Sequence, residues 1–387
     1  MRYKLSKLIS RPKLNPKKLF LVVNVDWFFL SHRLPIALEA KERGYEVTIF
    51  AIEEGGHGDE IRQHGFRFIP LPTSRSGTNI FQELNVLWFL YKIYKKEKPD
   101  IIHHVAVKPV TYGSVAAKLA KIPKVVNALS GLGFLFINAD QNKFIHRLVN
   151  GVFRYGFKNP NLKFILQNRD DYKLIQQLDV LDKQQIFIIK GSGVDLATFP
   201  FTEMVNGEEL KVVLPARMLW DKGVGEFVEA AKILKKKYSN SVHFILAGGI
   251  DMGNKAGIPE TQLVEWHEGG NVQWIGYQKD MVTIFQASDI VVLPSYREGL
   301  PKSLIEACAI GRPIVTTDVP GCREVVEDGL NGYLVENKNI EDLAAKIELL
   351  INDKDLRTRM GTFAREKAEK EFSLDNVLEQ TFKIYEL

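Results

Sequence analysis

Short apolar runs alternate with longer amphipathic segments along most of the chain. In the first half the apolar runs predict β-strands at 19–25, 45–51, 65–72, 101–107, 124–128, 163–167 and 185–189. The segments between them predict helices at 31–43, 80–96, 113–121 and 170–178. Strands that alternate with helices pair in parallel, so this half predicts a Rossmann-like α/β sheet.

The same alternation returns in the second half. Strands are expected at 211–216, 242–247, 272–275, 290–293 and 313–316, with helices near 259–267 and 279–287 and further helices through residue 387. Residues 199–209 are polar and show no periodicity, which predicts a linker. The pattern therefore predicts two α/β domains.

Composition agrees with an ordinary α/β protein. The chain has 387 residues, 45% of them hydrophobic and 26% charged, enough for two cores. Cys308 and Cys322 are too few for a disulfide framework and lack metal spacing, which favours buried thiols in a reducing compartment. No export-type apolar core precedes residue 19, and 19–30 is too short for a membrane span, so we expect a cytoplasmic chain.

Positive charge is unevenly distributed. Residues 1–18 form a basic tail that has no acidic residue; its cations are Arg2, Lys4, Lys7, Arg11, Lys13, Lys17 and Lys18. Residues 134–163 alternate aromatic and aliphatic side chains with cations, a pattern typical of a helix at a bilayer interface. We expect peripheral contact with an anionic membrane and no nucleic-acid partner. A solvated tail and an ordinary surface helix are the alternatives.

The stretch 289–311 carries the strongest candidate site. A buried strand stops at Pro294, a polar turn follows, and Pro301 opens a helix whose free N–H groups can bind an anionic or hydroxyl-rich ligand. Glu298 lies in the turn and Glu306 lies eight positions further on, so the two carboxylates are expected to flank the mouth of the helix. A capping carboxylate and a solvated helix residue are the structural alternatives.

A pair of cations follows the first strand of the second half. Arg217 lies directly after 211–216, and Lys222 comes five positions later, just before a glycine and a helix. Arginine can bind a diphosphate in bidentate fashion and lysine as a point charge. The spacing predicts a diphosphate site.

These segments resemble family 4 of the retaining glycosyltransferases, which have the GT-B fold. The resemblance rests on Leu-Pro-Ser before Glu298, the sequence GLPKS at 299–303, seven residues between the two glutamates, and ARMLWDKG at 216–223. It implies that Glu298 and the backbone of Gly299, Leu300, Pro301 and Lys302 hold the donor sugar. Glu306 would hold the ribose, Tyr277 would lie beside the base, and Arg217 and Lys222 would stabilise the leaving diphosphate.

The resemblance also implies an architecture. Two Rossmann-like domains would face each other across a cleft, with residues 19–200 binding the acceptor and 201–370 binding the nucleotide sugar. Residues 371–387 would form a helix that returns to the first domain.

The first half shows a looser resemblance. It has no G-x-G-x-x-G, so a dinucleotide cofactor is not expected, and the loop 24–32 carries polar and aromatic residues instead of the glycine pair of many relatives. The sequences HHVAVKP and NALSGLG resemble a subgroup that builds cell-surface polysaccharides and lipid-linked oligosaccharides. His32, His104 and Lys108 are candidates for the acceptor side of the cleft. His103 and His104 lie on opposite faces of their strand, so only one can reach the cleft, and a core histidine is the alternative.

The resemblance implies a hexosyl- or N-acetylhexosaminyltransferase with retention of configuration. The donor would be a nucleotide sugar, UDP-linked by family habit, and the acceptor a polyprenyl diphosphate-linked saccharide at the inner face of the plasma membrane. No metal or other cofactor is expected, because Asp353-Lys-Asp355 lies away from every candidate loop. A UDP-sugar epimerase of the same fold and a noncatalytic sugar-binding scaffold are the rival functions.

Overall fold

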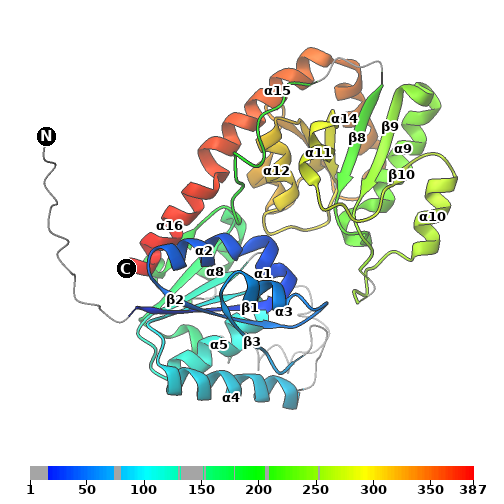
Figure 1. Cartoon of the computed structure of the whole chain (residues 1–387). Coiled ribbons are helices and arrows are strands. Elements are labelled where there is room, and N and C mark those ends of the chain that lie inside the picture. Colours follow the sequence, from blue (N-terminus) through cyan, green and yellow to red (C-terminus); the bar gives the residue numbers. More distant parts are fainter. Residues whose placement is uncertain are drawn as a thin grey trace, which may run out of the picture.

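The chain forms two α/β lobes joined by a helical C-terminal segment (Figure 1). The computed structural model describes residues 16–73, 80–129, 131, 151, 154–177, 179–204, 209–251 and 253–387. The basic tail and most of the expected interfacial helix at 134–163 lie outside the described residues, as do parts of the loop 127–136.

The first lobe is built on a parallel sheet, whose described strands follow the order β3-β2-β1-β4-β5-β6-β7. Both faces of β1 are buried, which explains why its sequence is an unbroken apolar run. The strands are β1 (Lys18–Val25), β2 (Glu46–Ile52), β3 (Arg67–Pro70), β4 (Ile101–Val105), β5 (Val125–Leu129), β6 (Leu162–Leu166) and β7 (Ile186–Ile188).

Helices cover both faces of this sheet. One face packs on α4 and α5 through residues such as Phe20, Leu90 and Val110, and the other packs on α1, α2 and α3 through Leu21 and Ile36. The helices of this lobe with described bounds are α1 (Asp26–His32), α2 (Leu34–Glu42), α3 (Gly58–Gln63), α4 (Ile80–Glu97), α5 (Val107–Leu119) and α8 (Arg169–Gln177).

Two expected boundaries in this lobe are wrong. The segment expected as a loop at 24–32 is largely the helix α1, which starts directly at the end of β1, and Pro35 then opens a separate helix α2. The strand expected at 101–107 ends at Val105, because the chain turns sharply at Ala106, where φ is 76°. Lys108 and Pro109 therefore lie in the first turn of α5 and not in a loop.

The second lobe repeats the arrangement with a parallel sheet in the order β10-β9-β8-β11-β12-β13 among the described strands. Relative to chain order, this sheet follows the Rossmann order 3-2-1-4-5-6, and the first sheet follows the same order with β7 added after β6. The strands are β8 (Leu210–Pro215), β9 (Val242–Ala247), β10 (Gln273–Trp274), β11 (Ile290–Leu293), β12 (Ile314–Thr317) and β13 (Gly332–Val335). The helices are α9 (Val224–Tyr238), α10 (Glu260–Glu268), α11 (Met281–Gln286), α12 (Lys302–Ile310), α13 (Cys322–Val325), α14 (Ile340–Asn352) and α15 (Lys354–Lys367).

The helix α12 is central to this lobe. All its residues from Leu304 to Ile310 are buried, since one side packs on β11 and β12 and another on α15. Cys308 lies inside this core, and Cys322 lies nearby at the start of α13; both are free thiols, and burial raises the pKa of each to about 12.

The end of the chain returns to the first lobe. After α15, a π-helical turn at Ala368–Phe372 leads into α16 (Leu374–Glu386), which lies against α2 (Figure 1). Phe382 and Tyr385 of α16 are buried in the core of the first lobe. We propose the division between the two domains at residues 200–201, between β7 and β8.

Candidate active site

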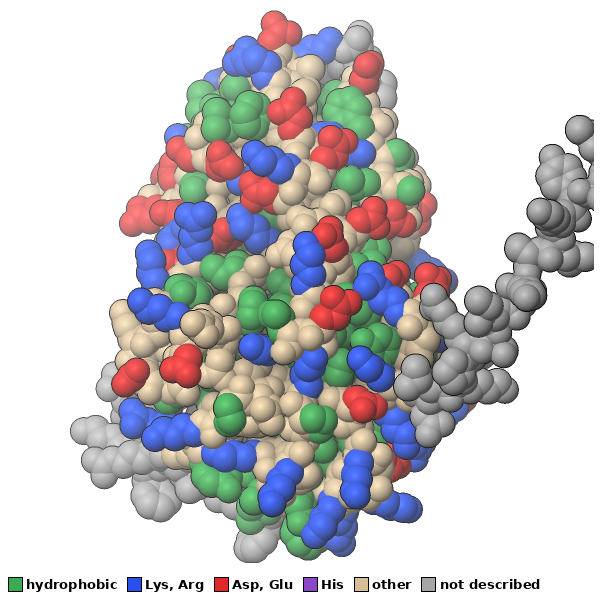
Figure 2. All heavy atoms as spheres, turned by 90° about the vertical axis from the view of Figure 1, so that its left-hand side faces the viewer, with side chains coloured by type: hydrophobic (Ala, Val, Ile, Leu, Met, Phe, Trp, Pro, Cys, Tyr) green, Lys and Arg blue, Asp and Glu red, His purple; other side chains and the backbone are tan. Residues whose placement is uncertain are grey.

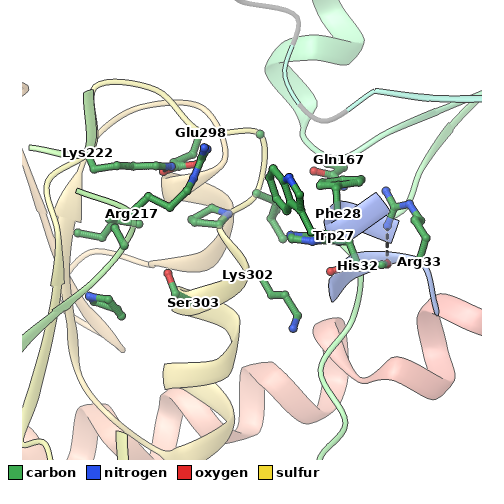
Figure 3. A pocket seen from close by; sticks show the side chains of 17 residues that line it. Trp27, Phe28, His32, Arg33, Gln167, Arg217, Lys222, Glu298, Lys302 and Ser303 are labelled. Atoms are coloured by element: carbon green, nitrogen blue, oxygen red, sulfur yellow. Dashed lines mark hydrogen bonds and ion pairs between the residues drawn. The ribbon is translucent and has the colours of Figure 1, made fainter. Parts of the chain in front are cut away.

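A cavity of about 330 Å³ lies between the two lobes, at the carboxyl ends of both sheets. Figure 3 shows side chains from the two lobes facing each other across it. The first lobe contributes Trp27, Phe28, His32, Arg33, Gln167 and Ser192, and the second contributes Pro215, Ala216, Arg217, Lys222, Leu293 and residues 298–303. We call this cavity the cleft pocket.

The loop between β11 and α12 forms one wall of the cleft pocket. Ser295 is fully buried and its hydroxyl donates to the carbonyl of Asp221, which ties this loop to the turn before α9. Gly223 permits the contact: its φ is 71°, and a Cβ there would lie 2.1 Å from the carbonyl oxygen of Pro294. Two loops distant in sequence are thereby locked together.

Each of the two expected phosphate-binding cations is paired with a carboxylate in this structure. Lys222 forms a hydrogen-bonded ion pair with Glu298, and Arg217 forms one with Asp251. Glu298 is nearly buried, with 11% of its side chain exposed. The structure therefore brings Arg217, Lys222 and Glu298 together in one pocket.

The N-terminus of α12 opens into the same pocket. Pro301 is its N-cap residue and no side chain caps it, so N–H groups of the first turn remain available beside the pocket. These groups and the helix dipole favour a negatively charged or hydroxyl-bearing ligand. Gly299, Leu300, Pro301 and Lys302 all line the pocket.

Aromatic and basic side chains of the first lobe form the opposite wall. His32 stacks on Phe28 with ring centroids 4.4 Å apart, and its Nδ1 lies 2.7 Å from the hydroxyl oxygen of Ser31. Burial and the nearby cations Arg33, Lys302 and Arg217 lower the pKa of His32 to about 3. The ring is therefore neutral near pH 7. Arg217 reaches across the pocket to within 5.9 Å of the Trp27 ring centroid.

Gly299 is held from both lobes. Its carbonyl accepts a hydrogen bond of 3.0 Å from the side-chain amide of Asn168, which is fully buried after β6. Gly131 of the first lobe packs on Gly299, since a Cβ on Gly131 would lie 3.6 Å from the Cα of Gly299. Gly321 of the second lobe lies closer still, since a Cβ on Gly321 would lie 2.4 Å from the carbonyl oxygen of Gly299. The position of this loop thus depends on how the two lobes are docked.

Two of the expected donor-binding residues do not line the cleft pocket. Glu306 is buried within α12 and pairs with Lys302 at 2.9 Å, and burial raises the pKa of its carboxyl group. Tyr277 is 77% exposed and packs beside Gly249, outside the pocket. Of the two glutamates expected to flank the mouth of α12, only Glu298 lies there.

His104 does not face the cleft pocket, contrary to the expectation. It is fully buried on the α4 and α5 side of the sheet, where its ring nitrogens lie 3.1 Å from the hydroxyl of Tyr94 and 2.9 Å from Oδ1 of Asn127. His103 points to the other face and lies 2.7 Å from the Tyr385 hydroxyl. The alternation of side chains along β4 correctly predicted that the two rings lie on opposite faces of the sheet, but both rings are buried in the core.

Lys108 also lies outside the pocket lining. Its ammonium group pairs with Glu83 of α4 at 2.7 Å. Of the three acceptor-side candidates, His32 alone lines the pocket.

Sequence reasoning missed Gln167, Asn168 and Ser192. Gln167 and Asn168 directly follow β6, at the sheet edge where open α/β folds bind ligands. Their position after a predicted strand could have indicated that they lie at the site. Arg33 lies just beyond the polar loop 24–32 and also lines the pocket. It is almost fully buried, its Nε has no hydrogen-bond partner, and no carboxylate among the described residues pairs with it. Burial lowers its pKa to about 10, so it remains a cation near pH 7.

No cluster of three or more His, Cys, Asp or Glu side chains suited to a metal ion occurs among the described residues. Asp353 caps the N-terminus of α15 by accepting a hydrogen bond from the backbone N–H of Leu356. It has a structural function there.

Two family models match successive parts of the chain. Residues 18–168 match "Glycosyl transferase 4-like", and residues 197–367 match "Glycosyl transferases group 1". The matched regions correspond to the two lobes and meet at the cleft pocket.

Characterised relatives match over nearly the whole chain. The chain is 32% identical over 379 residues to the N,N'-diacetylbacillosaminyl-diphospho-undecaprenol alpha-1,3-N-acetylgalactosaminyltransferase of Campylobacter jejuni, covering 92% of this chain and 97% of that protein. It is 26% identical to the UDP-Gal:alpha-D-GlcNAc-diphosphoundecaprenol alpha-1,3-galactosyltransferase of Escherichia coli, covering 89% and 88% of the two chains.

Solved structures match in fold. A glycosyltransferase of Rickettsia africae superposes with a TM-score of 0.77 at 20% identity, covering 96% of this chain and 98% of that one. HepE of Anabaena in complex with UDP and glucose superposes with a TM-score of 0.75 at 18% identity, covering 96% of this chain and 99% of that one.

The fold and the family models define a glycosyltransferase with the GT-B architecture, two Rossmann-like lobes facing across a cleft. The chain belongs to family 4 of these enzymes, among relatives that act in polysaccharide assembly. The expected fold class, family and enzyme class are confirmed.

Proposed function

We propose that this enzyme transfers a sugar from a UDP-sugar to a polyprenyl diphosphate-linked saccharide, with retention of configuration. The observation that carries the proposal is the convergence of Arg217, Lys222 and the N-terminus of α12 on one pocket. The names of the Campylobacter and Escherichia relatives both specify diphospho-undecaprenol-linked acceptors, and the latter specifies a UDP-sugar donor. We place the enzyme on the inner face of the plasma membrane, where such an acceptor is anchored.

The donor diphosphate would bind where cations and helix N–H groups meet. Lys222 and Arg217 would exchange Glu298 and Asp251 for phosphate oxygens, and α12 would add its dipole. As the bond between the anomeric carbon and the phosphate oxygen breaks, its electron pair passes to the diphosphate, and these groups stabilise the growing charge. Glu298, released from Lys222, would accept hydrogen bonds from the sugar hydroxyls, and no metal ion is required in this scheme.

The acceptor hydroxyl would attack from the face that the diphosphate leaves, and its proton would pass to a phosphate oxygen. His32 is poorly suited to take that proton, because a ring with a pKa of about 3 is a weak base at neutral pH. We assign His32 and Trp27 to positioning the acceptor. Glu306, enclosed in α12, would act on the nucleotide only through Lys302 or after a rearrangement of their ion pair.

The test begins with a thermal-shift comparison of UDP, GDP and ADP. A nucleotide at 100 times its dissociation constant raises the free energy of unfolding by about 2.7 kcal/mol. Incubation with UDP-sugars and a polyprenyl diphosphate-linked saccharide should then yield UDP and an extended lipid. Formation of an epimeric sugar without an acceptor would instead identify an epimerase, and binding without any turnover would identify a sugar-binding scaffold.

A further inference from the structure

The helix α4 presents an apolar face to solvent as well as one to the core. Val86, Leu90 and Tyr94 are buried against the sheet of the first lobe. On the opposite side, Leu84 is 58% exposed and Trp88 is 52% exposed. Large exposed apolar side chains at helical spacing mark an interaction surface more often than isolated ones do.

The outward residues form a continuous stripe. Because successive helix residues turn by about 100°, positions 84, 88, 91, 92 and 95 share the side opposite to 86, 90 and 94. Trp88 stacks on Tyr91 with ring centroids 5.2 Å apart, Lys92 lies 5.4 Å from the Trp88 ring, and Lys95 lies 5.5 Å from the Tyr91 ring. We call Leu84, Trp88, Tyr91, Lys92 and Lys95 the outer stripe of α4.

The charge of this surface is positive. The acidic residues of α4 are Glu83 and Glu97, and both are paired, Glu83 with Lys108 and Glu97 with Arg67 through two hydrogen bonds. The same layer of helices carries another lysine over an aromatic ring, Lys118 at 4.4 Å from Tyr155. Figure 2 shows Lys and Arg side chains gathered at the lower end of the molecule, where α4 lies in Figure 1, with few acidic groups among them.

We propose that the outer stripe of α4 is the surface on which this enzyme lies against an anionic bilayer. Tryptophan and tyrosine favour the boundary between headgroups and acyl chains, leucine enters the apolar side, and the lysines meet lipid phosphates. This inference rests on the proposed function, since a lipid-linked acceptor requires the enzyme to work at a membrane. No helix of the described residues is long and apolar enough to cross one.

The position of the stripe suits that task. Lys108, in the first turn of α5, pairs with Glu83 at the start of α4, and α5 begins directly after β4, at the sheet edge that faces the second lobe. The stripe therefore starts near the cleft edge of the first lobe and runs away from it along α4. A bilayer under α4 would hold a lipid-linked diphosphate close to the mouth of the cleft.

The experiment uses the full chain and vesicles of phosphatidylcholine with or without phosphatidylglycerol. We expect binding to the anionic vesicles that weakens with salt, and at least a ~10-fold loss of binding in the double variant Leu84→Glu/Trp88→Glu. The matched control is Leu349→Glu/Phe363→Glu, which changes two exposed apolar residues on helices of the second lobe (47% and 45% exposed) and should bind like the parent. Trp88→Phe should still bind but lose a blue shift of tryptophan fluorescence.

A second readout separates this inference from the proposed function. UDP should still raise the melting temperature of the Leu84→Glu/Trp88→Glu variant, which we call the stripe variant. This variant should still glycosylate a short-chain, water-soluble acceptor but should lose activity on an acceptor embedded in vesicles. Equal vesicle binding by the stripe variant and the parent overturns the membrane surface but leaves the transferase proposal intact. Loss of a dimer by the stripe variant with unchanged vesicle binding would also overturn it, because the occupant would then be a second copy of the chain.

Discussion

At the scale of single residues, three of the four Lys and Arg side chains that line the cleft pocket are paired with carboxylates. Lys222 is paired with Glu298, Arg217 with Asp251, and Lys302 with Glu306. Arg33 is the exception among the described lining residues, since it has no carboxylate partner. The ion pairs thus hold these cations in place until a ligand arrives, and in the proposed mechanism phosphate oxygens would replace the carboxylates of Glu298 and Asp251.

Replacing Lys222 by Gln tests the leaving-group role. The amide can still donate to Glu298 but carries no charge, so we expect the turnover rate to fall by about 10² to 10³-fold with the fold retained. Steady-state transfer assays and circular dichroism measure the two effects. Lys232→Gln on the exposed face of α9 is the matched control, and equal turnover in both variants would contradict the role of Lys222.

The buried histidines predict loss of stability in acid. Burial lowers the pKa of His104 from 6.5 to about 4, so between these values the unfolded chain binds more protons than the folded one. The free energy of unfolding should therefore fall with falling pH, by about 1.4 kcal/mol per unit from this group. Urea unfolding from pH 7 to 4 should give a shallower slope for His104→Gln than for the parent; parallel slopes would refute the prediction.

At the scale of elements, the N-terminus of α8 connects the first lobe to the loop between β11 and α12. Asn168 caps α8 by accepting from the N–H of Asp171 and donates to the Gly299 carbonyl. Beside it, the backbone N–H of Arg169 donates to Glu324, and Asp170 pairs with Arg323. Sequence periodicity predicted α8 but not this contact, because nothing in a helix cap specifies a partner 131 residues away.

The variant Asn168→Ser separates capping from positioning. Serine is a good N-cap but is too short to reach Gly299, so we expect about tenfold lower turnover with nearly unchanged stability and UDP affinity. Transfer kinetics, a UDP titration and thermal melts provide the three readouts. Asn339→Ser, at the N-cap of α14, is the control. If Asn168→Ser lost stability but kept its turnover, Asn168 would act only as a helix cap.

At the scale of the whole molecule, the final helix ties the two lobes together. The chain leaves the second lobe through α15, and α16 buries Val377, Phe382, Ile384 and Tyr385 in the core of the first lobe. Tyr385 also contacts His103, 282 positions earlier. A short C-terminal segment thereby completes a core that starts near the N-terminus.

Removing residues 374–387 should prevent stable folding of the first lobe. Four buried apolar side chains at about 1.5–3 kcal/mol each amount to about 6–12 kcal/mol, which is comparable to the whole stability of a typical domain. Calorimetry and proteolysis of the truncated chain would measure this. The control variant Glu379→Ala/Lys383→Ala removes only an exposed ion pair of α16 and should melt like the parent. A truncated chain with an unchanged melting profile would contradict the prediction.

The sequence by itself determined the class of fold and most of the order of strands and helices, because the periods of hydrophobicity follow from backbone geometry. It did not predict α1, α3 or β13, which are short elements. It also located the segments 217–223 and 298–306, because motifs of that length depend on local spacing. Only the tertiary structure decided that Glu306 is enclosed in α12, that His104 faces α4 and not the cleft, and that Asn168 reaches Gly299. Those outcomes depend on how the two lobes dock and on which helices cover each sheet. Local propensity carries no information about contacts between residues so far apart in the sequence.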